Sequence, residues 1–172
     1  MTVHSESAPA SAQDAIEELY RAHALGLVRF ALMLTGDQVT AEDVVQEAFI
    51  GLYRRWHQIR DHASVLPYLR TAVVNGARSA HRSRKRAGLL RLPAEPPAWS
   101  AEAAALDGED RRALHAAVSR LPRRQREVLA LKYYLDLAEH EVAAILQISR
   151  GTVSTTAARA LATLSKQLKE ES

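Results

Sequence analysis

The chain has 172 residues, of which 47% are hydrophobic and 25% are charged, and its formal net charge is +3. This composition is that of a globular protein with one ordinary domain or two small ones. The absence of cysteine excludes disulfide bonds, thiol catalysis and cysteine-ligated zinc, and the small net charge makes the distribution of lysine and arginine more informative than their total.

The first expected helix covers residues 15–34, where apolar side chains recur at helical spacing until Gly36. Residues 1–14 before it are expected to be a flexible tail. A second helix is expected from Ala41 to about Trp56, with Thr40 as its N-cap and with Glu42 and Asp43 in its first turn. Trp56 is in phase with the apolar face, so it is expected in the core.

A third helix is expected to begin near Ser64 and Pro67 and to end at about Arg86, after the basic run HRSRKR. The three helices predict an all-helical domain over residues 15–87. Residues 88–106 contain three prolines and no periodicity, which predicts a flexible linker. The sequence therefore predicts an all-α fold of two small helical bundles, the second over residues 107–169.

The second bundle is expected to contain a helix from about Asp107 to Arg120, another from Pro122 to Tyr134, and a helix-turn-helix. Its two helices, Leu137–Leu146 and Arg150–Leu168, are separated only by residues 147–149, and Asp136 is a candidate cap for the first. The last helix is expected to present a polar stripe that can enter a major groove. Its opposite, buried side is expected to include Val153, Ala157, Ala160, Leu161, Leu164 and Leu168.

Taken together, these segments resemble an extracytoplasmic-function sigma factor of the sigma-70 superfamily. AEDVVQEAFIGLYRRW from Ala41 resembles the helix that docks on the clamp of RNA polymerase, and PYLRTAVVNGARSAHRSRKR from Pro67 resembles the element that melts and reads the minus-10 region. Residues 121–164 resemble the domain that reads the minus-35 element. GTVSTTAARAL from Gly151 resembles the sigma-E-like subgroup common in high-GC actinobacteria. The family usually has glycine where Gln147 stands, so either the turn avoids positive φ or strain is tolerated.

The resemblance implies three binding surfaces. An acidic helix face suits a basic protein partner and not DNA, and the expected polymerase-binding residues are Glu42, Asp43, Gln46, Glu47 and Ile50. Cationic side chains can bind successive phosphates and an amide can read a base edge. The expected minus-10 residues are therefore Arg60, His62, Thr71, Asn75, Arg78, Arg82 and Arg86. The expected minus-35 residues are Arg150, Thr152, Ser154, Thr155 and Arg159. Either phosphate contacts or simple solvation would explain Arg123, Arg124 and Arg126.

The expected function is a sigma factor that binds core RNA polymerase and directs promoter recognition, melting and transcription initiation. No nucleophile and base, carboxylate pair or metal-ligand spacing is apparent, so no enzyme activity, cofactor or metal is expected. The chain has no apolar run that could span a bilayer and no secretory signal, so we expect it in the bacterial cytoplasm. An anti-sigma factor could be a further partner. The alternatives are a stand-alone helix-turn-helix regulator and a scaffold that makes only protein contacts.

Overall fold

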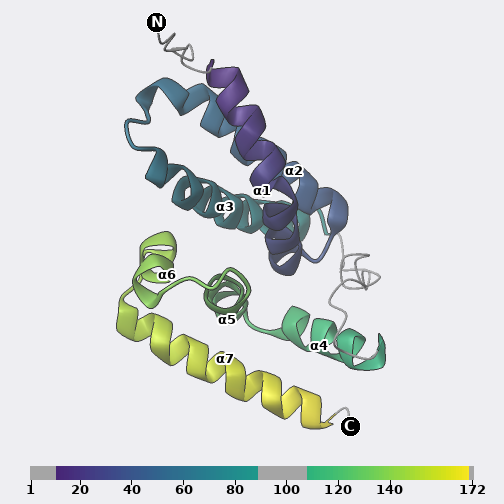
Figure 1. The fold of residues 1–172 in the computed structure, drawn as a ribbon. Helices are drawn as coiled ribbons and strands as arrows, with labels where there is room; N and C mark the ends of the chain where they lie inside the picture. Colours follow the sequence, from purple (N-terminus) through teal and green to yellow (C-terminus); the bar gives the residue numbers. More distant parts are fainter. Residues whose placement is uncertain (1–10, 89–107, 171–172) are drawn as a thin grey trace, which may run out of the picture.

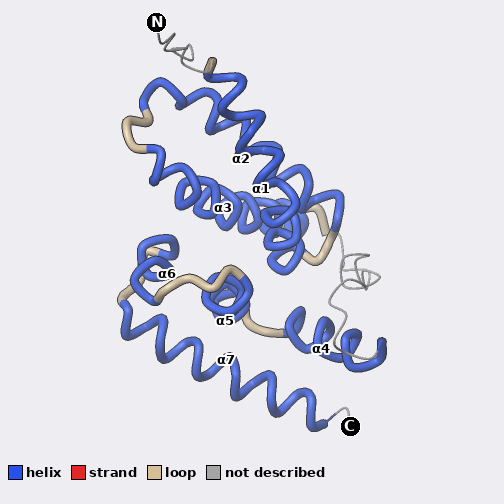
Figure 2. The backbone as a smooth tube through the Cα atoms, viewed as in Figure 1, coloured by secondary structure: helices blue, strands red, loops and turns tan. Residues whose placement is uncertain are grey.

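A computed structural model describes residues 11–88 and 108–170, and every regular element among them is helical (Figure 2). The first bundle contains α1 (Ala12–Thr35), α2 (Gln38–Arg55) and α3 (Val65–Arg86), with short 3₁₀ turns η1 (Trp56–Gln58) and η2 (His62–Ser64) between α2 and α3. The all-α fold expected from the sequence is confirmed. None of the described helices is both long and apolar enough to cross a membrane.

The second bundle contains α4 (Gly108–Arg120), α5 (Arg123–Leu129), α6 (Glu139–Leu146) and α7 (Arg150–Glu170). A π-helical turn, η4 (Ala130–Tyr134), continues directly from α5. Figure 1 shows α5 and α6 between α7 and the first bundle, so α7 lies on the side that faces away from α3. The predicted linker lies outside the described residues except for Gly88, as do residues 1–10 of the predicted tail.

The helix α1 begins three residues before the predicted start and ends where the sequence indicates. The Ser11 hydroxyl accepts a hydrogen bond from the backbone N–H of Asp14 at 3.2 Å, and the Asp14 carboxylate accepts from the Ser11 N–H at 3.3 Å. This reciprocal capping box satisfies two backbone donors at the start of the helix. Gly36 ends it with φ 72°, a left-handed conformation that glycine adopts without steric cost.

The prediction that Thr40 caps α2 is wrong. Asp37 is the N-cap, because its carboxylate accepts the backbone N–H of Thr40 at 2.9 Å, and Thr40 becomes the third helical residue. The first turn therefore carries no acidic side chain, and Glu42 and Asp43 lie one turn further along. Aspartate caps a helix at least as well as threonine, and here the tertiary contact with Arg84 holds it in place.

The helix-turn-helix has the predicted three-residue turn but not the predicted cap. Ala138 is the N-cap of α6, and its backbone N–H donates to the Glu141 carboxylate at 2.8 Å. Asp136 instead has φ 53° and lies outside the cap, so the expectation that it caps α6 is wrong. Gln147 has φ 55° and ψ 47°, so of the two alternatives for the turn the chain tolerates the left-handed residue.

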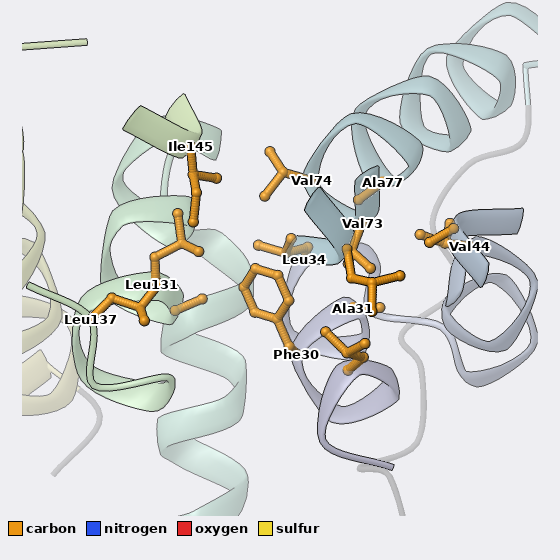
Figure 3. Packing of buried hydrophobic residues seen from close by; sticks show 14 of the residues in the cluster. Phe30, Ala31, Leu34, Val44, Val73, Val74, Ala77, Leu131, Leu137 and Ile145 are labelled. Atoms are coloured by element: carbon orange, nitrogen blue, oxygen red, sulfur yellow. The ribbon is translucent and has the colours of Figure 1, made fainter. Parts of the chain in front are cut away.

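One continuous apolar core joins the two bundles. Phe30 and Leu34 of α1 and Val74 of α3 face Leu131 of η4 and Ile145 of α6 across the boundary (Figure 3). Phe30 and Leu131 are fully buried, and Val74 is 1% exposed. Burying these side chains removes apolar surface from water and thereby stabilises the arrangement in which the bundles touch.

The last helix buries a narrower stripe than the sequence predicts. Val153, Ala157 and Ala160 are at most 2% exposed, while Leu164 is only partly buried. Leu161 is 46% exposed, so its assignment to the buried side is wrong. It follows Ala160 directly, and a step of one residue turns the helix by about 100°. The remaining surface of α7 is free to carry polar side chains.

Candidate protein and nucleic-acid interfaces

The outer face of α2 is acidic and open to solvent. Its buried face, with Val44, Val45 and Leu52, packs against the other two helices, which leaves the opposite side uncovered. The structure places all five expected polymerase-binding residues on that uncovered side, namely Glu42, Asp43, Gln46, Glu47 and Ile50. This surface, the α2 acidic face, combines anionic groups with one exposed aliphatic side chain.

Two aromatic residues beside the α2 acidic face were missed by the sequence reasoning. Tyr53 is 57% exposed and lies one turn after Ile50, which is 41% exposed. Tyr20 of α1 is 44% exposed, and its ring meets that of Phe49 edge-on with centroids 5.0 Å apart. Exposed aromatic and aliphatic groups next to charges are typical of protein interfaces. The signal for Tyr53 was its three-residue spacing from Ile50.

The connection between α2 and α3 is more ordered than a plain loop. The Asp61 carboxylate accepts from the backbone N–H of Ala63 at 3.0 Å, and the Ser64 hydroxyl donates to the Asp61 carbonyl at 2.6 Å. Arg60 and His62 are exposed on this connection. The His62 ring lies 5.4 Å from the ring of Trp56, which packs against the core as expected.

The outer side of α3 carries an amide and several cations. Asn75, Arg82 and Arg86 are exposed and Thr71 is half-buried. Arg82 and Arg86 also line, with Lys85, an open depression at the end of the helix. A chain of cations along an exposed helix end provides a surface that can follow a nucleic-acid backbone.

Arg78 differs from its neighbours on α3 because it is bound to the second bundle. Its Nε donates to Glu127 Oε1 at 2.7 Å and its Nη2 donates to Oε2 at 2.8 Å. The side chain of Glu127 is 3% exposed and that of Arg78 is 21% exposed. Hydrogen bonding to this carboxylate raises the pKa of Arg78, against the opposing effect of burial. This bidentate pair, the interdomain ion pair, joins α3 to α5.

The arginines of α5 have different environments. Arg126 is 6% exposed, and its Nη1 donates to the Ser119 carbonyl at 3.0 Å, so it is held inside the bundle and does not lie on an open surface. Arg123 is half-exposed, and its Nε lies 3.7 Å from Glu127 Oε1. It therefore gives the buried carboxylate a second, weaker cationic neighbour.

The first turns of α7 present the expected minus-35 residues. Arg150, Thr152, Ser154, Thr155 and Arg159 are all exposed. The Ser149 hydroxyl accepts from the backbone N–H of Thr152 at 3.0 Å, which caps the helix, and lies 2.8 Å from the Thr152 hydroxyl. Sequence reasoning missed Ser149, although a serine just before a helix is a typical capping signal. No cluster of three metal-binding side chains occurs in residues 11–88 and 108–170.

Comparisons with known proteins agree with both halves of this arrangement. The family model for Sigma-70 region 2 matches residues 19–87, and that for Sigma-70 region 4 matches residues 111–164. The RNA polymerase sigma-E factor of Streptomyces avermitilis is 35% identical over 153 residues, which cover 88% of this chain and 84% of the relative. This chain belongs to the sigma-70 family of RNA polymerase sigma factors.

Other relatives place the sigma factor in the extracytoplasmic-function group. The sigma-E factor of Streptomyces coelicolor is also 35% identical over 153 residues, covering 88% of this chain and 85% of that one. The extracytoplasmic-function sigma factor SigM of Bacillus subtilis is 29% identical over 154 residues, covering 84% and 90%. The sigma factor therefore functions in transcription initiation. The joint match to two sigma regions favours this function over a stand-alone helix-turn-helix regulator.

Solved structures share the fold of the sigma factor. The sigma factor RpoE of Bartonella quintana, solved with the anti-sigma factor NepR, superposes with a TM-score of 0.74 at 23% identity, covering 90% of this chain and 97% of that one. CnrH, solved with the cytosolic domain of CnrY, superposes with a TM-score of 0.68 at 23% identity, covering 93% and 91%. At this identity the likeness shows the fold alone.

Proposed function

We propose that the sigma factor divides its contacts by charge. The α2 acidic face docks on core RNA polymerase, the α2–α3 connection and the outer side of α3 bind the minus-10 element, and the first turns of α7 bind the minus-35 element. The observation that carries this proposal is a contrast between exposed helix faces. Three exposed carboxylates, Glu42, Asp43 and Glu47, share the outer face of α2, whereas α3 and the first turns of α7 carry exposed cations and no carboxylate. Anionic groups are repelled by phosphates and attract a basic protein surface.

Asn75 and the residues of the α2–α3 connection have the most specific roles in binding the minus-10 element. Asn75 is exposed on α3, and its amide can both donate to and accept from a base edge. Arg60 and His62 precede it on the connection and stand where an unstacked base can be held by stacking and hydrogen bonds. Arg82 and Arg86 then neutralise phosphates further along the strand.

The interdomain ion pair requires the bundles to separate before Arg78 can bind DNA. Two of its donors are used by Glu127, so a phosphate must compete with a buried carboxylate for the same guanidinium. Core polymerase supplies the force for separation by binding the two bundles at different places. Two weak DNA readers fixed on one polymerase then gain effective concentration, so neither needs high affinity for free DNA.

The partner proteins and the compartment follow from this function. The sigma factor has no catalytic activity of its own in this proposal and acts on polymerase in the cytoplasm. We also propose an anti-sigma factor that covers the α2 acidic face and thereby competes with polymerase. Two relatives in fold were solved in complexes, one of them with a protein named as an anti-sigma factor, which supports this regulation.

A transcription and binding experiment tests the proposal. Genomic fragments transcribed in vitro by core polymerase with the sigma factor identify a promoter, and gel shifts then compare free sigma factor with reconstituted holoenzyme. We expect poor promoter binding by the free protein and specific binding by the holoenzyme. Tight, sequence-specific binding by the free protein would contradict it.

Single-residue variants test which surface binds polymerase and which binds the promoter. Asp43→Lys should weaken core binding, whereas Glu18→Lys on the exposed side of α1 is the matched control and should bind core normally. Arg159→Ala should weaken promoters that depend on the minus-35 element and leave core binding unchanged. Equal core binding by Asp43→Lys and Glu18→Lys would refute docking through α2.

A further inference from the structure

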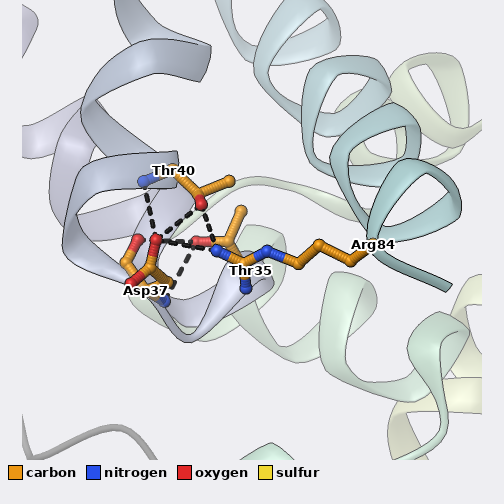
Figure 4. Close-up of polar contacts among 4 residues, drawn as sticks. All are labelled: Thr35, Asp37, Thr40 and Arg84. Carbon is orange, nitrogen blue, oxygen red and sulfur yellow. Dashed lines mark hydrogen bonds and ion pairs between the residues drawn. The ribbon is translucent and has the colours of Figure 1, made fainter. Parts of the chain in front are cut away.

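The basic run at the end of α3 contains one cation that behaves differently from the rest. Arg82, Lys85 and Arg86 are exposed and line an open depression. Arg84 instead extends to the start of α2, where its Nη2 donates to the Asp37 carboxylate at 2.7 Å and also to the Thr40 hydroxyl (Figure 4). Arg84 therefore joins the two helices through protein acceptors.

The acceptor of Arg84 is itself firmly held. The Asp37 carboxylate accepts the backbone N–H of Thr40 at 2.9 Å and the Thr40 hydroxyl at 2.5 Å, in addition to Arg84. The hydrogen bonds from Thr40, followed by the nearby charge of Arg84, lower the pKa of Asp37. Three donors around one ionised carboxylate fix its position, so the guanidinium bound to it is fixed as well.

We propose that Arg84 is a positioning residue that sets the angle between the polymerase-docking helix α2 and the DNA-reading helix α3, and is not a phosphate ligand. This inference rests on the proposed function, because it takes α2 to dock on polymerase and α3 to bind the promoter. The last turn of α3 carries the exposed cations, so fixing that turn fixes where they meet the DNA relative to polymerase.

The alternative, in which Arg84 turns outward to a phosphate, is disfavoured by charge. That movement would break the contact with Asp37 and leave an unpaired carboxylate at the side of an anionic strand. Arg82, Lys85 and Arg86 already present cations at the same helix end. The same run therefore contains cations for DNA and one cation for the protein.

The experiment measures promoter affinity and open-complex formation by reconstituted holoenzyme over a range of salt concentrations. The variants are Arg84→Gln, Asp37→Asn, the two together, and Arg82→Gln as the matched control on the same helix. Asparagine caps a helix as well as aspartate, so Asp37→Asn keeps the start of α2 while weakening its hold on Arg84. If Arg84→Gln does not fold, the Asp37→Asn variant still tests the contact between Asp37 and Arg84.

We expect Arg82→Gln to lower the slope of log affinity against log salt by roughly 0.7–0.9, because one phosphate contact is lost. Arg84→Gln and Asp37→Asn should each reduce open-complex formation by about two- to fivefold, with the wild-type slope retained. The double variant should be no worse than either single variant, since both changes break the same link.

A phosphate-binding role for Arg84 would give the opposite pattern. Arg84→Gln would then lower the salt slope as Arg82→Gln does, and Asp37→Asn would tighten binding because it frees a cation and removes an anion. Either result overturns the positioning role. Failure of the proposed function would give a different result. The wild-type protein would then confer no promoter binding on core polymerase, or Arg82→Gln would leave the slope of log affinity against log salt unchanged. Either of these results would also refute the positioning role.

Discussion

Breaking the interdomain ion pair should open the sigma factor. The change is Arg78→Ala, which leaves the Glu127 carboxylate buried at 3% exposure without its bidentate partner. Removing one partner of a fully buried pair costs about 3–5 kcal/mol. Arg78 is 21% exposed and Arg123 lies 3.7 Å from the same carboxylate, so we expect a smaller cost of about 2–3 kcal/mol. Separation of the bundles lets water reach Glu127 and relieves this cost.

A shift of this size changes the ratio of open to closed molecules by roughly 30- to 140-fold, since about 1.4 kcal/mol corresponds to a factor of ten. The chain has no cysteine, so Glu18→Cys and Ser165→Cys provide one dye site on each bundle for energy-transfer measurements. Arg78→Ala should shift molecules to low transfer efficiency. Arg82→Ala, an exposed arginine one turn along α3, is the matched control and should not.

A rescue variant tests the electrostatic reason for opening. Arg78→Met combined with Glu127→Leu replaces the pair by apolar side chains of comparable length next to the shared core. Replacing both partners of a buried pair by apolar groups is often neutral or stabilising. The double variant should therefore return to high transfer efficiency. An unchanged distribution for Arg78→Ala, indistinguishable from that of Arg82→Ala, would refute the idea that the ion pair holds the bundles together.

Three further predictions concern stability. The pKa of Asp37 is lowered in the folded protein, so its stabilising contribution is present above the unfolded-state pKa and is lost as the pH falls through the lower folded-state value. The difference in melting temperature between wild type and Asp37→Asn should therefore shrink below about pH 4, and a constant difference would contradict this. Gln147→Gly should stabilise the protein by about 0.5–1 kcal/mol in thermal melts, because glycine accepts the left-handed turn without strain, and a lower melting temperature would count against it. Leu131→Ala should cost about 2–5 kcal/mol in urea titrations, since Leu131 is fully buried, whereas Leu161→Ala should change stability by less than about 0.5 kcal/mol; similar losses for both would show that burial is misassigned.

Local periodicity was enough to predict the helices and the helix-turn-helix. The three-residue turn at 147–149 and the end of α1 at Gly36 were each predicted from residues that lie close to the feature in the sequence. The start of α2 was misplaced because Asp37 and Thr40 can both cap a helix. The contact that favours Asp37 comes from Arg84, which lies 47 residues away in the sequence.

The relation between the bundles could not be predicted from local patterns. Helices were predicted over the segments that contain Leu131 and Ile145, but periodicity does not tell whether the apolar face of a helix packs within its own bundle or against another one. Glu127 stands among arginines, which offered nearer partners than Arg78. The exposed positions on α2, α3 and α7 were predicted because each lies opposite a continuous apolar stripe, and their binding roles stay predictions.

The shared apolar core links the melting behaviour of the sigma factor to its activity. Phe30, Leu131 and Ile145 contribute to one cluster that spans the boundary, so heating the free protein should disrupt both bundles in a single cooperative transition. In the proposed complex with polymerase the bundles are separated, so each must hold its fold with a core of its own, and a small core gives only a small free energy of folding. Release from polymerase then exposes apolar surface until the halves rejoin. Rapid reassociation would thus protect the unbound protein from proteolysis and aggregation.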